Sequence, residues 1–323
     1  MFDLSTLATR QAAFQNARTK PSKLGIALTT YNRVETLLKQ ISLIRRLSVS
    51  EIELVVCDDG SSDHTLEALA QNGVLTVGGV NRGIAWNKNR GIFYLFTYTD
   101  VDVVILLDDD VLPRLHGWDA EIVHAARSYG HINYLPKSMA HYALAGGMAA
   151  DDVGITEFIS GICLGISRAA FARVGFMDPR FGKYGHEHTD YSRRFLRAGY
   201  GGFVKATPKG NADYFYVLGG GLELADVPST GTEAEERANA ALLIQLANDP
   251  IYRLPWRDDT QRAAFLAEFA AFNSPVVPEI ASLAKEFDEE LYLAANPDVQ
   301  AAGMKAFYHY INFGRAENRL LAP

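Results

Sequence analysis

Three aspartates, Asp108, Asp109 and Asp110, directly follow an apolar run, Val-Ile-Leu-Leu, at residues 104–107. Such a run is typical of a buried strand in a parallel sheet. Three adjacent carboxylates at the end of a strand repel one another, and a bound divalent cation would remove that cost. Carboxylate oxygens suit Mg²⁺ or Mn²⁺, which commonly bind through one or two acids plus the phosphates of a substrate. The alternative is a solvated turn whose acids cap the next helix.

Two further polar turns follow predicted strands earlier in the chain. One is Thr-Thr-Tyr-Asn-Arg at 29–33, and the other is Asp-Asp-Gly-Ser-Ser at 58–62. The carboxyl ends of parallel strands lie along one edge of a sheet, where open α/β folds bind ligands. The second turn also leads into a helix, whose first N–H groups can bind an anion or a carboxylate. Each turn alone is weak evidence, but three of them, spaced by strand–helix units, predict one shared ligand site.

The elements that position these turns alternate between strand and helix. Strands are predicted at 24–30, 53–57, 75–80 and 101–107, and helices at 34–47, 63–71 and 84–98. Further along we predict helices at 115–129, 168–174 and 189–198, an antiparallel strand at 158–167 and a last strand at 203–207. This order predicts an α/β fold with a mostly parallel, mixed sheet between helices.

Composition limits the class of protein. The 323 residues are 48% hydrophobic, which allows a substantial core and more than one domain. The net charge of −7 argues against nucleic acid as a partner. Cys57 and Cys163 lie in apolar runs and are expected to be buried thiols of a reducing compartment. We find no leader pattern and no run that could span a bilayer, so we expect a cytoplasmic protein, free or peripheral at the inner face of the membrane.

The chain divides into three parts by composition. We predict an N-terminal helical arm at 1–22, an α/β domain at 23–260 and a helical C-terminal module at 261–323. Tryptophans Trp86, Trp118 and Trp256 are candidates for stacking on a sugar, but helix-borne tryptophans more often belong to the core.

Five stretches of the chain resemble, in the same order, the motifs of glycosyltransferase family 2. They read GIALTTYNR from Gly25, VVCDDGSSDHT from Val55, NRGIAWNKNRGI from Asn81, ILLDDDVLP from Ile105 and FMDPRFGKYGHEHTD from Phe176. The resemblance covers about residues 22–215. It implies the GT-A fold, a nucleotide-diphosphate sugar as donor and dependence on Mn²⁺ or Mg²⁺.

The resemblance also implies roles for residues of the first turns. Thr30 and Tyr31 would line the base and ribose pocket, with Arg33 beside them, and Asp59 would accept a hydrogen bond from the ring N–H of uracil. That contact favours a UDP-sugar, with a TDP-sugar as the alternative. Arg82 would contact the diphosphate or the sugar, although a solvated loop arginine fits the sequence equally well.

The three aspartates take separate roles under the same resemblance. Asp110 would contact the metal directly, Asp108 would touch the ribose or the metal's water shell, and Asp109 would lie on the nucleotide side. The cation would stabilise the departing nucleoside diphosphate. Some relatives supply a histidine ligand after the base segment. This chain has none between His188 and His309, so Asn211 or Asp213 would have to replace it.

The segment expected to hold the catalytic base departs from the common family pattern. Glu187 and Asp190 match the family's acids, whereas His188 stands where an aspartate is usual. An imidazole can act as a general base near neutral pH, Glu187 could take the same role, and Asp190 could orient either group. A helix start enriched in capping acids is the structural alternative.

Around the base we expect residues 133–161 to form the acceptor side, where Gly161 and Cys163 could face the acceptor. The glycine-rich stretch 209–221 is expected to form a mobile lid. His186, Glu187 and His188 could instead hold a transition metal.

The C-terminal stretch from His309 reads HYINFGRAENR and resembles a short helical module appended to some bacterial glycosyltransferases and surface proteins. We expect His309, Glu317 and Arg319 to cap helices and pair with one another. Acceptor binding and self-association as a homo-oligomer are both open for this module.

The sequence therefore predicts an inverting, metal-dependent glycosyltransferase. It would act on a glycan or glycolipid acceptor in bacterial surface polysaccharide synthesis. One alternative is a nucleotide-sugar-binding or scaffold protein without catalysis. The other is a metal-dependent hydrolase that uses the His186–His188 cluster.

Overall fold

The computed structural model describes residues 23–208, 210–227, 231–270, 287–304, 306–310, 314, 317 and 319–323. The predicted helical arm at 1–22 lies outside these residues. Among the described helices, none combines the length and the apolar character needed to cross a membrane.

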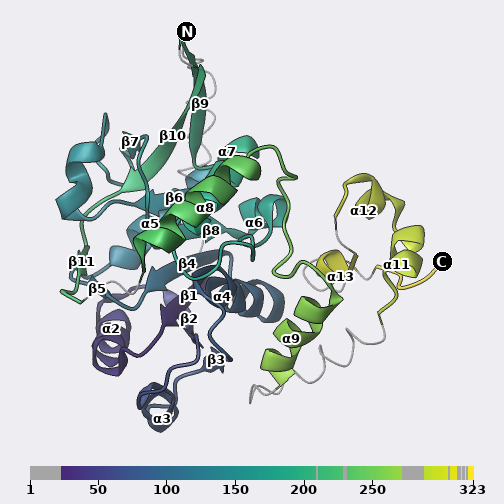
Figure 1. Cartoon of the computed structure of the whole chain (residues 1–323), viewed down its shortest axis with the longest axis horizontal. Coiled ribbons are helices and arrows are strands. Elements are labelled where there is room, and N and C mark those ends of the chain that lie inside the picture. The colour runs from purple at the N-terminus through teal and green to yellow at the C-terminus, as the bar shows by residue number, and fades with distance from the viewer. Residues whose placement is uncertain are drawn as a thin grey trace.

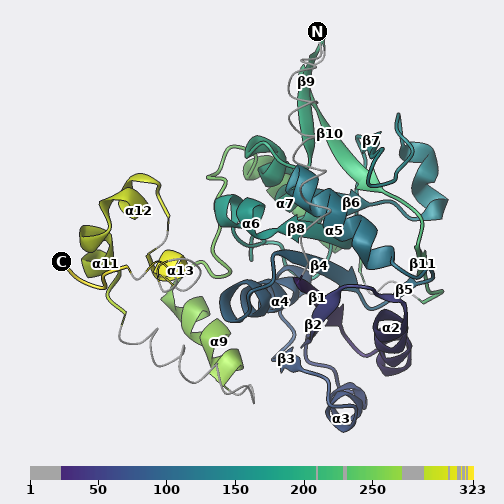
Figure 2. The same cartoon turned by 180° about the vertical axis from the view of Figure 1, so that it is seen from behind.

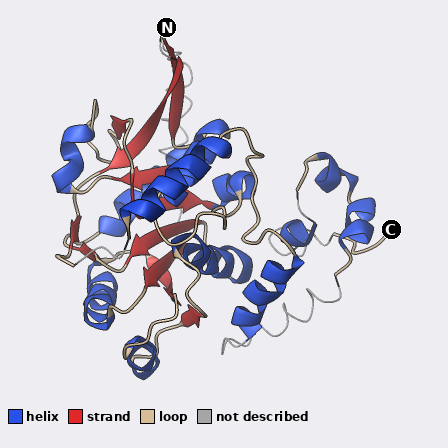
Figure 3. Cartoon of the chain, in the orientation of Figure 1, coloured by secondary structure: helices blue, strands red, loops and turns tan. Residues whose placement is uncertain are grey.

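A mixed sheet of nine strands forms the centre of the molecule, with helices on both sides (Figure 1, Figure 3). Its order is β3-β2-β1-β4-β8-β6-β10-β7, with β9 paired to β10. Their bounds are β1 Lys23–Thr30, β2 Glu51–Asp58, β3 Thr76–Gly78, β4 Val103–Asp108, β6 His131–Tyr134, β7 Gly154–Thr156, β8 Ser160–Ser167, β9 Gly202–Thr207 and β10 Gly210–Leu218. A separate pair joins β5 Val111–Pro113 to β11 Leu222–Leu224.

Strands β3, β2, β1 and β4 are parallel, whereas β8 runs antiparallel to both β4 and β6. The predicted mixed sheet with an antiparallel strand beyond residue 158 is therefore confirmed. The four parallel strands end at one edge, where Thr29 is in register with Asp108 and Thr30 with Asp58. This register brings the three polar turns together.

The helices cover the two faces of the sheet in two separate cores. Their bounds are α2 Val34–Leu47, α3 Thr65–Gln71, α4 Ile84–Tyr98, α5 Trp118–Tyr129, α6 Arg168–Val174, α7 Glu187–Arg197, α8 Glu233–Gln245 and α9 Asp259–Ala270. Alternate residues of the central strands face opposite cores: Ala27 packs toward α4, and Ile26 and Leu28 pack toward α2 and α5. Helix α8 crosses the face seen in Figure 1, and α5 crosses the opposite face, seen in Figure 2.

The predicted helices at 34–47, 84–98 and 168–174 are confirmed residue for residue. The predicted lid at 209–221 is wrong for most of its length, because Gly210–Leu218 is strand β10 of the central sheet. Phe215 and Val217 point into the protein interior and hold the strand in place. Strand 203–207 is therefore not the last one, since β10 and β11 follow it.

Helix α9 packs against the α/β core although it lies beyond the predicted boundary at residue 260. Its Phe265 and Phe269 are buried, and their ring centroids lie 5.4 Å and 5.0 Å from that of Phe93 of α4. The boundary stays a prediction, but the contacts of α9 place residues 259–270 with the α/β domain.

The C-terminal helices α11 Glu289–Ala295, α12 Pro297–Ala301 and α13 Ala306–His309 lie beside α9 (Figure 2). Arg319 pairs with Glu317 at 2.7 Å, as expected, and also with Asp298. His309 Nδ1 lies 2.8 Å from the buried Tyr292 hydroxyl. These contacts make His309 and Arg319 parts of the module's own packing.

Candidate active site

The first two polar turns interlock at the carboxyl edge of the sheet. Asn32 adopts a left-handed conformation with φ of 54°, which turns the chain sharply after β1. Its side-chain oxygen accepts hydrogen bonds from the backbone N–H groups of Ser62 and Asp63, while its own N–H donates to Ser61 Oγ. The turn after β1 is thereby fixed to the turn after β2.

Asp109 faces the end of β1, and its predicted place on the nucleotide side stays a prediction. Its carboxylate accepts from Thr30 Oγ1 at 2.8 Å and from the Tyr31 N–H at 3.3 Å, and it pairs with Arg33 at 3.2 Å. Burial raises the pKa of Asp109 to about 7, although Arg33 and Thr30 favour the charged form. Thr30, Tyr31, Arg33 and Asp109 thus form one cluster.

Asp110 has the features of a metal ligand. One carboxylate oxygen pairs with Arg33 at 3.4 Å, and the other, Oδ1, is buried without a hydrogen-bond partner. A buried acceptor left unsatisfied is costly unless something outside the protein binds it. No group of three metal-ligating side chains occurs among the described residues. The site therefore fits a Mg²⁺ or Mn²⁺ ion held by one or two carboxylates with substrate phosphates, rather than a cage made of protein alone.

Asp108 is the first residue of the aspartate turn, and it lines the cavity described below. Its Oδ1 accepts from Thr29 Oγ1 at 3.2 Å and lies 3.0 Å from Lys88 Nζ. Burial raises the pKa of Asp108, and Lys88 opposes this shift. Gln40 donates to the backbone oxygens of Asp108 and Val111, both at 2.7 Å, and so fixes the turn from α2.

Asp59 is held by the protein itself. It accepts from the backbone N–H groups of Arg82 and Gly83 and from the buried Arg90 guanidinium. Burial raises the pKa of Asp59, although these hydrogen bonds act to lower it. The Arg82 side chain lies over Trp86, 4.7 Å from the ring centroid, and 3.6 Å from Glu268. The predicted contacts of Asp59 with uracil and of Arg82 with the diphosphate therefore stay predictions.

Lys88 is a site residue that we did not predict. It is buried on α4, and its Nζ donates to the Gly161 carbonyl at 2.8 Å. The same ammonium lies 3.0 Å from Asp108 and 4.0 Å from Glu187. Burial opposes its charge, but the two carboxylates outweigh burial and raise the pKa of Lys88. One cation thus joins the aspartate turn to the start of α7.

Glu187 and His188 form a pair at the start of α7. Glu187 is buried, and its Oε1 lies 3.2 Å from His188 Nδ1. Burial alone would raise the pKa of Glu187, but His188 and Lys88 lower it to about 2. An ionised carboxylate can only accept, so His188 Nδ1 carries a proton in this contact. Among the described residues, His188 Nε2 has no hydrogen-bond partner.

Asp190 and His186 are placed differently. Asp190 is buried, pairs with Arg194 at 2.8 Å one turn along α7, and does not line the cavity. The structure therefore does not bring it to the Glu187–His188 pair. His186 precedes the helix in a left-handed conformation and lines the cavity. No three-ligand metal cluster around it occurs among the described residues, so the hydrolase alternative gains no support.

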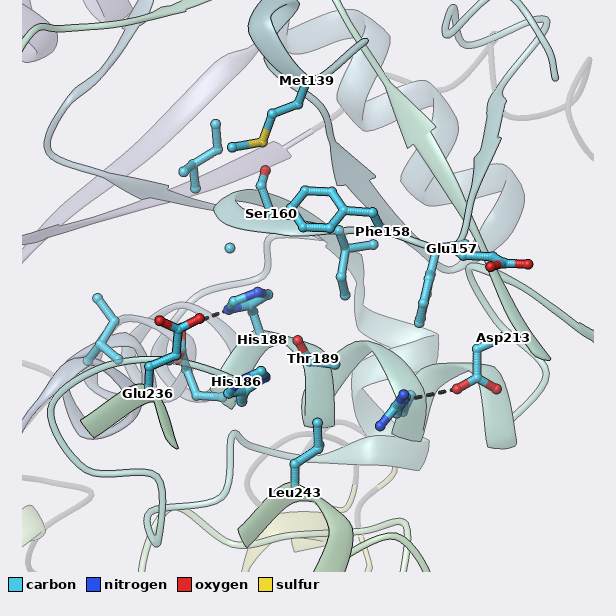
Figure 4. A pocket seen from close by; sticks show the side chains of 18 of the residues that line it. Met139, Glu157, Phe158, Ser160, His186, His188, Thr189, Asp213, Glu236 and Leu243 are labelled. Atoms are coloured by element: carbon cyan, nitrogen blue, oxygen red, sulfur yellow. Dashed lines mark hydrogen bonds and ion pairs between the residues drawn. The ribbon is translucent and has the colours of Figure 1, made fainter. Parts of the chain in front are cut away.

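A cavity of about 680 Å³ joins these groups (Figure 4). Asp108, Glu187 and His188 line it together with Gly161. Figure 4 shows Phe158 and Ser160 on one wall, with His186 and His188 facing them. A Cβ at Gly161 would lie 2.6 Å from His188 Nδ1, so glycine is needed beside the imidazole.

Of the remaining predicted residues, some line this cavity and others lie in the protein core. Asn211 and Asp213 of β10 do line it, and Asp213 pairs with Arg193 at 2.9 Å. Cys163 is buried in the core behind the cavity. Trp86, Trp118 and Trp256 belong to the two hydrophobic cores.

The sequence and the fold both resemble known glycosyltransferases. Residues 26–149 match the family model described as Glycosyl transferase family 2. An uncharacterized glycosyltransferase of Acanthamoeba polyphaga mimivirus is 27% identical over 190 residues, which cover 54% of this chain and 73% of that protein.

Two solved structures of glycosyltransferases are among those similar to this chain. GalNAc-T7, solved with UDP, GalNAc and Mn²⁺, gives a TM-score of 0.51 at 13% identity, covering 94% of this chain and 59% of that one. The mannosyltransferase PcManGT of Pyrobaculum calidifontis, solved with GDP-Man and Mn²⁺, gives 0.47 at 15% identity and covers 98% of each chain. Residues 26–149 are therefore similar to glycosyl transferase family 2, and the fold of the chain is GT-A.

Proposed function

We propose that this protein transfers a sugar from a nucleotide-diphosphate donor, favouring UDP, to a hydroxyl group of a glycan or glycolipid acceptor. The observation that carries the proposal is the shared cavity, because Asp108 from the donor edge and the Glu187–His188 pair line the same space. Lys88 contacts both sides of it. In a single displacement the donor sugar and the acceptor hydroxyl must lie in one space, so that the acceptor oxygen can reach the anomeric carbon.

The donor side consists of the Asp109 cluster and Asp110. Thr30, Tyr31 and Arg33 stand where a nucleotide would meet the carboxyl ends of the strands. The GalNAc-T7 structure, which contains UDP and Mn²⁺, supports the same donor class for this chain. Asp110, with its unpartnered oxygen, and Asp108 would hold the cation, which would neutralise charge on the departing diphosphate.

We assign the catalytic base to His188, with Glu187 as the residue that orients it. The low pKa of Glu187 makes this carboxylate a weak base. Its hydrogen bond with Nδ1 instead orients the His188 imidazole. His188 Nε2 would take the proton of the acceptor hydroxyl while the acceptor oxygen bonds to the anomeric carbon. The bond from that carbon to the phosphate oxygen breaks, and the nucleoside diphosphate leaves. A single displacement of this kind inverts the anomeric configuration.

We propose surface polysaccharide synthesis in a bacterium as the setting, on the strength of the family resemblance. A cytoplasmic place of action, free or peripheral at the inner face of the membrane, belongs to the same proposal. Cys57 and Cys163 are buried free thiols, which suits a reducing compartment. Whether the protein acts as a homo-oligomer stays open in this proposal.

Calorimetric titration of the protein with UDP, TDP, GDP, CDP and ADP, with and without Mn²⁺, tests the donor assignment. UDP or TDP should bind selectively, and removing Mn²⁺ or replacing Asp110 by Ala should weaken binding at least about tenfold. The matched control is Asp100→Ala, which removes an exposed acid paired with Lys23. Equal binding of all nucleotides, or Mn²⁺ dependence that survives Asp110→Ala, would overturn the assignment.

A further inference from the structure

The exposed aromatic side chains of this protein gather at the site. Among the described residues, four side chains of Phe, Tyr or Trp are exposed: Tyr31, Tyr142, Phe158 and Tyr184. Tyr31 belongs to the Asp109 cluster, and Phe158 and Tyr184 line the cavity. Tyr142 stacks on Phe158 with ring centroids 4.5 Å apart. An exposed apolar patch of this kind commonly marks a binding surface.

We call the stacked residues His141, Tyr142 and Phe158 the aromatic ledge. The His141 and Tyr142 ring centroids are 4.2 Å apart, so the three side chains form one continuous surface. Tyr142 ends the short 3-10 helix η1 Lys137–Tyr142, and Phe158 lies between β7 and β8. Phe158 lines the cavity, and Tyr142 continues the surface from it.

Backbone hydrogen bonds hold the two parts of the ledge together. The Leu144 N–H donates to the Ile155 carbonyl at 2.7 Å, and the Ile155 N–H donates to Ala145 at 2.8 Å. The Phe158 N–H donates to Thr156 Oγ1 at 2.9 Å. The rings are therefore positioned before any ligand binds, which reduces the entropy lost on binding.

The surroundings of the ledge match a saccharide better than a lipid tail. Hydrogen-bonding side chains of Glu157, Ser160, Asn211 and Asp213 line the same cavity as Phe158. A sugar ring presents an apolar C–H face to an aromatic ring and hydroxyl groups at its edge, so it uses both kinds of contact. An acyl or polyprenyl chain could use the aromatic contact but could form no hydrogen bond with these polar groups.

The charge of the cavity narrows the class of saccharide. Its acidic lining residues are Asp108, Glu157, Glu187, Asp213 and Glu236. Arg193 is the one arginine or lysine among the lining residues, and Asp213 already pairs with it. Lys88 pairs with Asp108 and Glu187, so a carboxylated, sulfated or phosphorylated ring on the ledge would meet chiefly the negative charge of Glu157 and Glu236.

We propose that the aromatic ledge is an acceptor subsite for a neutral glycan of at least two sugar rings. This inference rests on the proposed function. One ring places its hydroxyl at His188, and the next ring stacks on Phe158 and Tyr142. The substrate is then a glycan chain or a glycan-bearing lipid recognised through its sugars, rather than a single sugar or a small phosphorylated metabolite.

Binding to an array of neutral and acidic glycans of one to six rings tests the subsite, using the full chain with Mn²⁺ and UDP. Neutral glycans of two or more rings should bind, and Tyr142→Ala and Phe158→Ala should each lower that signal at least tenfold. Tyr142→Phe keeps the ring and should retain binding. Leu66→Ala removes an exposed side chain on α3, remote from the ledge, and should change nothing.

Four results would overturn the subsite: no glycan bound, single rings bound as well as longer chains, acidic glycans preferred, or binding unchanged in both alanine variants. A parallel measurement uses vesicles of phosphatidylethanolamine and phosphatidylglycerol. If Tyr142→Ala lowers vesicle binding and spares glycan binding, the ledge contacts a membrane instead. Titration of each variant with UDP separates these outcomes from failure of the donor site, because loss of UDP binding would count against the proposed function alone.

Discussion

Replacing Glu268 by Ala should destabilise the whole α/β domain, although Glu268 lies outside the predicted domain boundary. Its carboxylate pairs with both sides of the buried Arg90 guanidinium, at 2.8 Å and 3.1 Å, and accepts from Trp86 Nε1 at 3.1 Å. Arg90 also donates to the backbone oxygen of Asp58 and to Asp59. Helix α9 thus reaches the second polar turn through one arginine.

The expected size of the effect follows from the burial of the pair. Removing one partner of a buried ion pair leaves the other charge uncompensated and costs about 3–5 kcal/mol. Arg90 keeps its contacts with Asp59 and with Asn87 Oδ1, so we expect the lower half of that range. Glu268→Gln retains an acceptor for Trp86 or Arg90 and should cost less.

Urea unfolding followed by far-UV circular dichroism and tryptophan fluorescence measures this cost. The matched control is Glu233→Ala, which removes a fully solvated acid paired with Arg237 at 3.8 Å and should have no resolvable effect. The reasoning is refuted if Glu268→Ala lowers the free energy of unfolding by less than about 1 kcal/mol, since an uncompensated buried guanidinium would then carry no cost.

Three further predictions concern the base, its surroundings and the response to acid. His188→Ala should lower kcat about 10²–10⁴-fold while the Kd for UDP stays unchanged; an equal loss of UDP affinity would show that His188 acts in donor binding. Gly161→Ala should lower kcat with little change in Tm, because its Cβ displaces the imidazole; Gly199→Ala, at an open position with φ of 86°, should instead act on Tm alone. Burial lowers the pKa of His131 to about 3, whereas the unfolded chain takes up this proton near pH 6.5. Between these values the unfolded state binds more protons, so stability falls as the pH falls, by up to about 1.4 kcal/mol per pH unit. His131→Gln should flatten the dependence of unfolding free energy on pH, and the exposed His64→Gln should leave it unchanged; equal slopes in His131→Gln and wild type would contradict this account.

The parallel half of the fold could be predicted because its local signals agree with its tertiary structure. Helix α2 has apolar residues at helical spacing, and β1 and β4 are continuous apolar runs that end in polar turns. Strand β10 could not be predicted in the same way. It begins with Gly210 and Asn211, which favour turns, and only its pairing with β6, β7 and β9 establishes it as a strand.

The candidate site was predictable where polar residues follow strands, and not where a contact spans distant elements. Lys88 lies in a run of polar residues on α4, which in a sequence is typical of a solvated face. A signal was nevertheless available. Four consecutive polar residues cover every side of one helical turn, and a helix packed on a sheet must bury one of its sides, so some of the four had to be buried: Asn87, Lys88, Asn89 and Arg90. Asp190 matched an acid of the family pattern, but in the structure Arg194 pairs with it inside the protein.

The aromatic ledge lies within the stretch 133–161 that the sequence predicted as the acceptor side, but the stacking itself had no signal in the sequence. Tyr142 and Phe158 are separated by a loop and the short strand β7, and their stacking depends on the fold of residues between them.

The most direct test of the central claim is to follow UDP-sugars by proton NMR in the presence of Mn²⁺ and a neutral oligosaccharide acceptor. The account predicts release of UDP that requires Mn²⁺, Asp110 and His188, with a product of inverted anomeric configuration. Release of UDP at an undiminished rate in His188→Ala, or a product that retains the configuration, would contradict it.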